Sequence, residues 1–315
     1  MRLLTFVAGP GPRLGVVVGE EAWDANLAVA AFRRGRGHPS PYTAADATVP
    51  ASAREFLRGG AAARRALEEA LADLRNAENV AGPRGERIRY PLGEVRFKAP
   101  ILDPPKIIAI GLNYADHAKE SGNPVPETPV TFAKFTNGLV GHREAIVYSR
   151  GTHLLDYEVE LAAVIGRAGK YIPREKALDY VGGYTIFNDV SQRDIQRADR
   201  QITRGKAGDT HAPMGPYLVT ADEVGDPHRL RLETRVNGDL RQSSSTDQFI
   251  FDVPHLISFL SQCFTLEPGD VIATGTPPGV GIHRKPPLLL KVGDVVTMTI
   301  DRLGTLENPV VAEAT

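Results

Sequence analysis

The sequence predicts an α+β protein with a smaller N-terminal α+β domain over residues 1–100 and a larger domain over residues 101–315 built on a mixed β-roll or barrel. Two observations carry this prediction. Prolines at 100, 104 and 105 mark a boundary, and beyond them apolar, β-branched runs dominate with only a few helices between them. This pattern lacks the regular strand–helix alternation of a doubly wound parallel sheet.

Composition excludes several classes of protein. The 315 residues are 42% hydrophobic and 24% charged, which is typical of a globular chain. With 37 basic and 38 acidic residues the net charge is −1, so we expect no nucleic-acid or membrane partner. No apolar run reaches transmembrane length, and the N-terminal run is too short for a signal peptide. The single cysteine, Cys263, excludes an internal disulfide, and we expect a buried thiol in a cytoplasmic protein.

The first domain is expected to carry no chemistry of its own. Its glycine–proline turn at 9–12 is no phosphate-binding loop, because proline lacks the N–H group that such a loop offers. Ser52 and Glu55 form a capping-box pattern in front of an amphipathic helix. The elements predicted here are strands at 3–8 and 14–18, a helix from 52 to 74 and a loop at 76–86.

The second domain is expected to be mostly strands. Asn237 and Gly238 form the strongest hairpin signal in the chain, and Pro254 suits the first turn of a helix. The predicted helices cover 113–120, 190–200 and 253–264. The predicted strands cover 106–111, 130–135, 145–148, 158–166, 183–188, 230–236, 239–243, 271–274, 288–291 and 295–300.

A carboxylate cluster is the strongest functional candidate. Side chains alternate along a strand, so Glu158 and Glu160 share the face opposite Val159 and raise each other's pKa unless a cation offsets them. Asp189 ends another apolar run. Three carboxylates without a thiolate or paired histidine favour Mg²⁺, Mn²⁺ or Ca²⁺ over Zn²⁺. The alternative is the solvated face of an antiparallel sheet.

Four further side chains suggest acid–base chemistry near this cluster. His117 and Glu120 are three residues apart on a predicted helix, where a carboxylate can orient an imidazole as a base; the alternative is a surface ion pair. Lys206 lies in a glycine-flanked loop and would reach into a site, or be simply exposed. Lys134, among aromatic residues of a strand, must find an anion or reach solvent.

Candidate groups for an anionic substrate lie on one helix and one loop. Arg193 and Gln196 share a helix face after Asp189, and Arg193 suits bidentate binding of a carboxylate. The glycine-rich loop 275–281 offers backbone N–H groups and the Thr276 hydroxyl to an oxyanion. A solvated helix and a plain turn are the alternatives.

These residues together give the chain a resemblance to the fumarylacetoacetate hydrolase family. The resemblance covers about 106–312, with every block in the same order and spacing, while the first hundred residues look like the smaller N-terminal domain of the longer bacterial members. The matching blocks are 111–120, 156–160, 182–196, 205–210, 214–216, 273–281 and 304–309.

The resemblance implies a mixed β-roll catalytic domain, a homodimer, and a lid around 122–126 that closes over a small anionic 2-oxo acid. Ala109 to Gly111 carry no carboxylate where the animal hydrolase has an extra ligand, so acylpyruvate hydrolases and oxaloacetate decarboxylases look nearer. His211 stands where many relatives have phenylalanine and is expected to fill space. The implied site is Mg²⁺ or Mn²⁺ on Glu158, Glu160 and Asp189, catalysis by His117, Glu120 and Lys206, and substrate near Lys134, Arg193, Gln196 and Thr276.

The leading functional hypothesis is metal-dependent hydrolysis of a C–C bond in a 2,4-dioxo acid of the acylpyruvate or fumarylpyruvate type, through an enolate that the metal stabilises. One alternative keeps the site and changes the reaction to decarboxylation of an oxaloacetate-type β-oxo acid, or to isomerisation of a dienoate diacid such as 2-hydroxyhepta-2,4-diene-1,7-dioate from aromatic catabolism. A second alternative is a non-catalytic protein that binds a metal or an oxo acid.

Overall fold

The computed structural model describes residues 1–9, 11–75, 77, 80–122 and 124–314. Positions 10, 76, 78, 79 and 123, which belong to the predicted turn, loop and lid, lie outside the described residues. No helix in the described part of the chain is both long enough and apolar enough to span a membrane.

A mixed twelve-stranded sheet runs through the whole molecule. Its neighbours are antiparallel except for β17 on β6 and β8 on β14, and no closed barrel forms among the described strands, because β4 and β7 remain edges. From one edge to the other, the strands of this sheet are β4 (Arg89–Pro91), β3 (Glu21–Asp24), β2 (Pro12–Val18), β1 (Arg2–Val7), β14 (Ala212–Thr220), β12 (Val181–Asn188), β11 (Val159–Ile165), β17 (Val271–Ala273), β6 (Ile107–Gly111) and β7 (Val130–Lys134). Two more strands lie outside this order: β5 (Arg96–Lys98) pairs with β1, and β8 (Leu139–Val140) pairs with β14.

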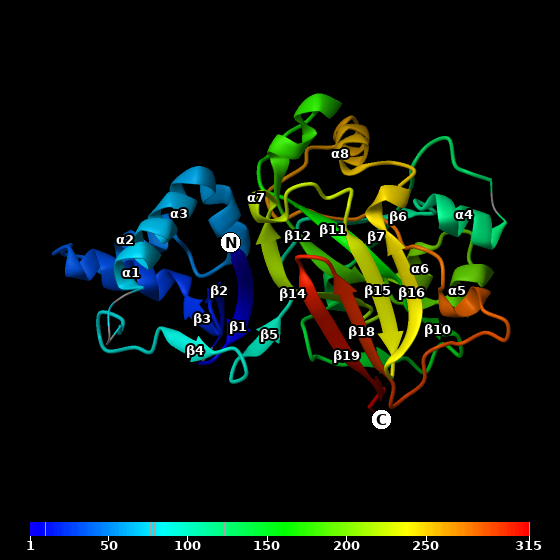
Figure 1. Ribbon diagram of the computed structural model, residues 1–315, viewed down its shortest axis with the longest axis horizontal. Coiled ribbons are helices and arrows are strands. Elements are labelled where there is room, and N and C mark those ends of the chain that lie inside the picture. The colour runs from blue at the N-terminus through cyan, green and yellow to red at the C-terminus, as the bar shows by residue number, and fades with distance from the viewer. Residues whose placement is uncertain (10, 76, 78–79, 123, 315) are drawn as a thin grey trace.

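A five-stranded sheet lies against one face of the larger sheet (Figure 1). Alternate residues of β11, such as Leu161 and Ala163, face a core that this second sheet shares, with Leu232 and Met298 on its side. The strands are β16 (Asp239–Ser245), β15 (Arg231–Val236), β18 (Val295–Ile300), β19 (Gly304–Ala312) and β9 (Ile146–Tyr148), and a separate pair joins β10 (Leu155–Asp156) to β13 (Ser191–Gln192).

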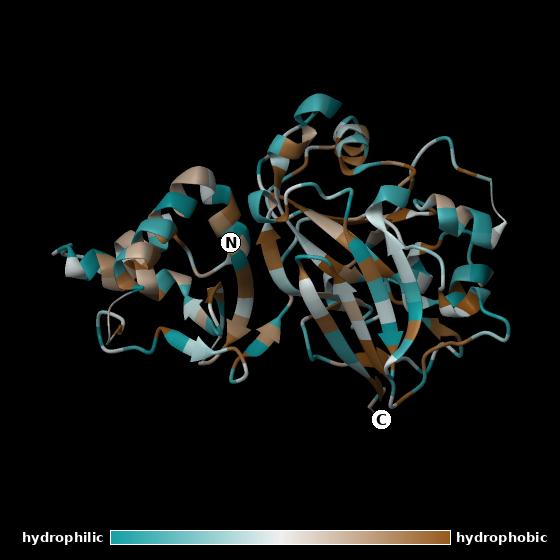
Figure 2. Ribbon diagram, viewed as in Figure 1, coloured by the Kyte–Doolittle hydropathy of each residue, from teal (hydrophilic) through white to brown (hydrophobic). Residues whose placement is uncertain are grey.

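The N-terminal segment forms a lobe beside the rest of the chain and shares its sheet, because β1 pairs with β14 at Arg2 and Leu3. The opposite face of β11, with Ala162 and Val164, belongs to a core that also contains Leu3 and Leu67 of this lobe. Figure 2 shows hydrophobic residues along β1 and β14 at this joint. The predicted boundary at 100/101 stays a prediction.

Helices cover the outside of the sheets. The helix predicted from Ser52 is confirmed, since the Ser52 hydroxyl accepts a hydrogen bond from the N–H of Glu55, although a positive φ of 55° at Gly60 kinks it. The helices are α1 (Ala25–Gly35), α2 (Pro41–Thr48), α3 (Ala53–Leu74), α4 (Ala115–Ser121), α5 (Arg193–Ala198), α6 (Thr203–Lys206), α7 (Ala221–Val224) and α8 (Val253–Ser261), with 3₁₀ segments at Thr136–Gly138, Arg174–Tyr180, Thr246–Gln248 and Gly281–His283.

Three local predictions are wrong. Residues 288–291 form no strand. The backbone N–H groups of Leu288 and Leu290 donate to the carbonyls of Gly281 and Leu155, which lie in different segments of the chain, so these hydrogen bonds do not form a ladder with one neighbouring strand. The helix predicted over 190–200 begins only at Arg193, since the preceding residues pair with β10. Cys263 is exposed, because α8 ends at Ser261 and its buried face does not continue that far.

Candidate active site

Three carboxylates converge where β11 begins and β12 ends. Glu160 lies opposite Phe187 across the ladder, and beyond it the N–H of Asp189 bonds the carbonyl of Glu158 at 3.0 Å. In an antiparallel pair, opposite and diagonal neighbours on one face come within reach of each other. One oxygen from each of Glu158, Glu160 and Asp189 therefore lies within 4.8 Å of the others, and all three residues are buried.

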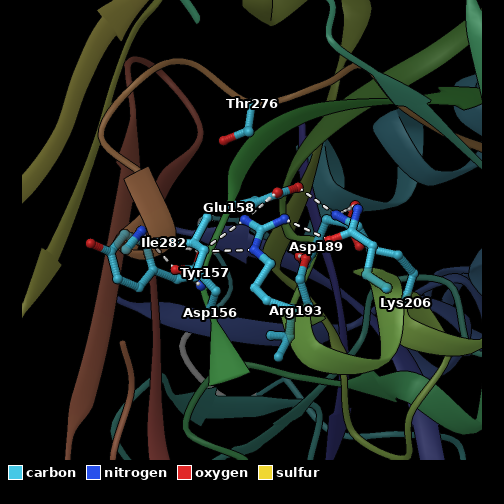
Figure 3. Close-up of polar contacts among 12 residues, drawn as sticks. Asp156, Tyr157, Glu158, Asp189, Arg193, Lys206, Thr276 and Ile282 are labelled. Atoms are coloured by element: carbon cyan, nitrogen blue, oxygen red, sulfur yellow. Dashed lines mark hydrogen bonds and ion pairs between the residues drawn. The ribbon is translucent and has the colours of Figure 1, made fainter. Parts of the chain in front are cut away.

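Two of these carboxylates are surrounded by cations (Figure 3). The Lys206 Nζ lies 2.7 Å from an oxygen of Glu158 and 2.7 Å from an oxygen of Asp189. The other oxygen of Glu158 lies 2.6 Å from Arg193 Nη2, and the other oxygen of Asp189 accepts from Lys134 at 2.5 Å. Burial opposes ionisation of Glu158, but the charges of Lys206 and Arg193 outweigh burial and hold its pKa at about 2.

Glu160 has a different environment. Its one hydrogen-bond donor among the described residues is the backbone N–H of Gly275, at 2.9 Å, and no described cation pairs with it. Burial, then the charges of Asp189 and Glu158, raises its pKa well above the usual range. The ionised form of such a buried carboxylate is stable only when a positive charge lies nearby.

A divalent cation satisfies this requirement. The three donors are hard carboxylate oxygens, the chemistry that Mg²⁺ and Mn²⁺ prefer, and no thiolate or histidine belongs to the cluster. A carboxylate oxygen has lone pairs for both a cation and a hydrogen bond, so Lys206 and the metal are compatible. Glu158, Glu160 and Asp189 fit Mg²⁺ or Mn²⁺.

The predicted base is formed on α4. His117 is only 9% exposed, and its Nδ1 lies 3.0 Å from Glu120. The second oxygen of Glu120 accepts from the N–H of Gly279 at 3.0 Å, and the Ser244 hydroxyl donates to Asp116 of the same helix at 2.6 Å. Glu120 thus orients the imidazole and also attaches α4 to the glycine-rich loop. Movement of a lid stays a prediction.

The loop 275–281 orients protein carboxylates instead of presenting most of its N–H groups to a ligand. Gly275 and Gly279 donate to Glu160 and Glu120, and the N–H groups of Gly281 and the adjacent Ile282 both donate to Asp156. The Thr276 side chain lies at the cavity wall, where it remains a candidate for substrate contact.

Gln242 fixes this loop and was not predicted. It is fully buried; its Oε1 accepts from the N–H of Val159 and from the Thr234 hydroxyl, and its Nε2 donates to the Thr276 hydroxyl and the carbonyl of Pro277. Its position on a strand with polar neighbours gave no signal of such a role.

We expect Gln242→Leu to lower the free energy of unfolding by about 3 kcal/mol, because it leaves several buried polar groups unpaired. The matched control is Gln248→Leu, because the Gln248 amide donates to Asp247 at 2.9 Å and to no other described residue. Chemical denaturation of both variants measures the difference, and equal, small losses would show that Gln242 does not hold the loop.

A cavity of about 230 Å³ opens beside the carboxylates. Figure 1 shows α4, α5 and α6 on the same side of the molecule, and each of these helices supplies a lining residue, namely His117, Arg193 and Lys206. Its wall combines polar and apolar side chains, as expected for a small-molecule site. The lining residues used below are His117, Glu158, Arg193, Gln196, Arg197, Lys206, Thr276 and His283.

Most predicted substrate-binding residues do line this cavity, but their contacts differ from expectation. The Arg193 guanidinium is already engaged by Asp156 at 2.9 Å, by Glu158, and by Gln196 at 3.0 Å. Lys134 is absent from the cavity wall and instead holds Asp189 and the carbonyls of Val190 and Lys206. Their contacts with substrate stay predictions, and the geometry indicates that both position the carboxylate cluster.

Besides Gln242, three residues were missed or left open by the sequence. Asp156, fully buried, anchors both Arg193 and the loop, yet a carboxylate two positions before Glu158 gave no separate signal. His283 lies at the cavity with its ring 5.8 Å from that of His117. His211 is fully buried, outside the cavity wall, with its Nε2 2.9 Å from the carbonyl of Val147, which fits a space-filling role.

Known proteins are similar to this chain in sequence and in fold. The family profile described as "Fumarylacetoacetate (FAA) hydrolase C-terminal" matches residues 106–311. The chain is 42% identical to the mitochondrial oxaloacetate tautomerase FAHD2B of Bos taurus over 99% of this chain and 92% of that protein, and 49% identical to the oxaloacetate tautomerase YisK of Bacillus subtilis (strain 168) over 70% and 75%. The crystal structure of maleylpyruvate hydrolase from Sphingobium sp. SYK-6 with manganese(II) and pyruvate superposes with a TM-score of 0.76 at 32% identity, covering all of both chains.

Fold and site together define an enzyme of a class that uses a divalent metal ion, with a mixed α/β scaffold and a buried carboxylate cluster that could hold the ion. The chain belongs to the fumarylacetoacetate hydrolase family. The resemblance seen in the sequence is thereby confirmed. The predicted cytoplasmic location and homodimer stay predictions, and the name of the bovine relative assigns that protein to mitochondria.

Proposed function

We propose that this enzyme interconverts the enol and keto forms of a small 2-oxo diacid of the oxaloacetate type. The observation that carries the proposal is an imidazole, oriented by a carboxylate, in the wall of the cavity that Glu158 of the carboxylate cluster also lines. Proton transfer next to a 2-oxo group needs such a base and a stabilised enolate, but no bound nucleophile. The two tautomerase relatives support this reaction over C–C hydrolysis.

A bound Mg²⁺ or Mn²⁺ would act as a Lewis acid that lowers the cost of charge on the 2-oxo oxygen. His117, held through Nδ1 by Glu120, presents its other ring nitrogen to take a proton from C3 of the substrate. The electrons of that C–H bond form the C2–C3 double bond, and the carbonyl π electrons move to oxygen. Return of the proton from His117 to the oxygen completes the enol, and the reverse sequence gives the ketone.

Lys206 contributes a fixed positive charge beside the developing enolate. Burial opposes its charged form, but the nearby Asp189 and Glu158 carboxylates outweigh burial and raise its pKa. The ammonium group therefore stays charged at neutral pH, where it stabilises anionic oxygen.

The test compares three products on the Mg²⁺- or Mn²⁺-loaded protein. We expect the loss of enol absorbance from freshly dissolved oxaloacetate to be accelerated more, in kcat/KM, than either CO₂ release from oxaloacetate or cleavage of acetylpyruvate and fumarylpyruvate. Chelator-treated protein is the control. A higher kcat/KM for cleavage or for decarboxylation would overturn the proposal.

The second candidate is hydrolysis of an acylpyruvate. The structural match to a maleylpyruvate hydrolase favours it, because the same base could deprotonate water instead of carbon. In that case two acids would appear in equal amounts from fumarylpyruvate in the assay above.

A further inference from the structure

The cavity contains few positive groups that are free to meet a ligand. Lys206 is engaged by Glu158 and Asp189, and the guanidinium of Arg193 is engaged by Asp156 and Glu158. A metal ion on the carboxylates would meet one end of a diacid. The second carboxylate, at the other end of the diacid, therefore needs a different positive group.

Arg197 differs from these two cations. It lines the cavity, it is exposed, and no described residue forms a hydrogen bond or ion pair with its guanidinium. It follows Arg193 by one helical turn on α5, and residues three and four apart share a helix face, so Arg193, Gln196 and Arg197 face the same space. Arg204 of α6 forms an ion pair at 2.7 Å with Asp199, the residue that follows α5, and this pair does not involve Arg197.

His283 is the other ionisable lining side chain with which no described residue forms a hydrogen bond or ion pair, but it does not supply a charge. Burial, then the neighbouring His117, lowers the pKa of its imidazole. At neutral pH the ring is therefore mostly uncharged. Arg197 remains as the available permanent cation of the cavity wall.

We propose that Arg197 binds the distal carboxylate of the substrate and so selects 2-oxo diacids over 2-oxo monoacids. Guanidinium matches a carboxylate with two parallel hydrogen bonds, which gives both affinity and orientation. This assignment rests on the proposed function, since it names the substrate class of the same site.

The test measures binding to the Mg²⁺-loaded full chain by calorimetry. (S)-malate and (S)-lactate share a 2-hydroxy carboxylate head and differ by the distal carboxylate, and neither has the ketone that the proposed reaction needs. We expect Arg197→Gln to weaken malate binding about tenfold and lactate binding less than twofold, the size of one charge-assisted contact at an exposed site. The same variant should raise KM for oxaloacetate and leave kcat nearly unchanged.

The matched control is Arg200→Gln. Arg200 is exposed just beyond α5, has no described partner and does not line the cavity, so both affinities should stay as in the unmodified protein. Equal weakening of malate and lactate, no weakening, or a wild-type protein without preference for malate would each overturn the role of Arg197. If malate selectivity depends on Arg197 while oxaloacetate tautomerisation is absent, the subsite stands and the proposed reaction fails.

Discussion

Replacing Glu160 by glutamine will abolish metal-dependent turnover and will make the metal-free protein more stable. The variant keeps the shape of the side chain and its contact with the N–H of Gly275. It removes a buried charge that has no described cation partner, so we expect the free energy of unfolding without metal to rise by about 1 kcal/mol. Loss of a carboxylate ligand should lower kcat/KM by about a thousandfold or more.

The stabilisation should depend on pH. Burial, then Asp189 and Glu158, raises the pKa of Glu160 in the folded protein. The folded state therefore holds this proton more tightly than the unfolded chain, and the resulting stability is present below the unfolded pKa of about 4.3 and is lost as pH rises through the folded pKa. Glutamine has no such proton, so the advantage of the variant should grow as pH rises. Denaturation in the presence of a chelator, from pH 5 to pH 8, measures it.

Glu158→Gln is the matched control, since it removes a ligand of the same type from the same cluster. Glu158 neutralises both Lys206 and Arg193, which are buried, so its loss should lower the free energy of unfolding by about 3 kcal/mol. Both variants should lose stabilisation by added Mn²⁺, with opposite effects on the metal-free protein. Retained metal-dependent turnover in Glu160→Gln would refute the metal site.

The carboxylate cluster could be predicted because it depends on local rules. Alternation along β11 places Glu160 on one face and Val159 and Leu161 on the other, which the two separate cores confirm. Turn chemistry was equally reliable, since Asn237 and Gly238 do join β15 to β16 with positive φ values of 53° and 86°.

What could not be predicted depends on partners far apart in the sequence. β14 and β19 were missed because they contain glycine and proline, which weaken a strand signal, while pairing across the sheets supplies their stability. The loop 275–281 carries the right N–H groups, but only the structure shows that Asp156 and Glu120 already accept from them. The residues of the site could therefore be identified from the sequence more reliably than the partners to which they are hydrogen-bonded.

Replacing His117 by glutamine will remove the base and leave both binding functions intact. We expect kcat for enol–keto conversion to fall by about a hundredfold to ten thousandfold, the usual contribution of a positioned general base. Affinity for Mn²⁺ and for malate should stay within about twofold, because His117 lies outside the triad of Glu158, Glu160 and Asp189. Exchange of the C3 protons of oxaloacetate in D₂O, followed by NMR, reports the proton transfer directly.

Three further variants distinguish the base from its neighbours. Glu120→Gln keeps a hydrogen-bond acceptor for His117 and loses the charge that supports an imidazolium, so a loss of about tenfold in kcat is expected. His283→Gln removes a neighbouring imidazole that has no described carboxylate partner and should have a smaller effect than His117→Gln. Added imidazole should partly restore exchange in a His117→Ala variant, since that substitution leaves space at the cavity wall. Exchange at the wild-type rate in His117→Gln would assign proton transfer to another group, and His283 would then be the next candidate.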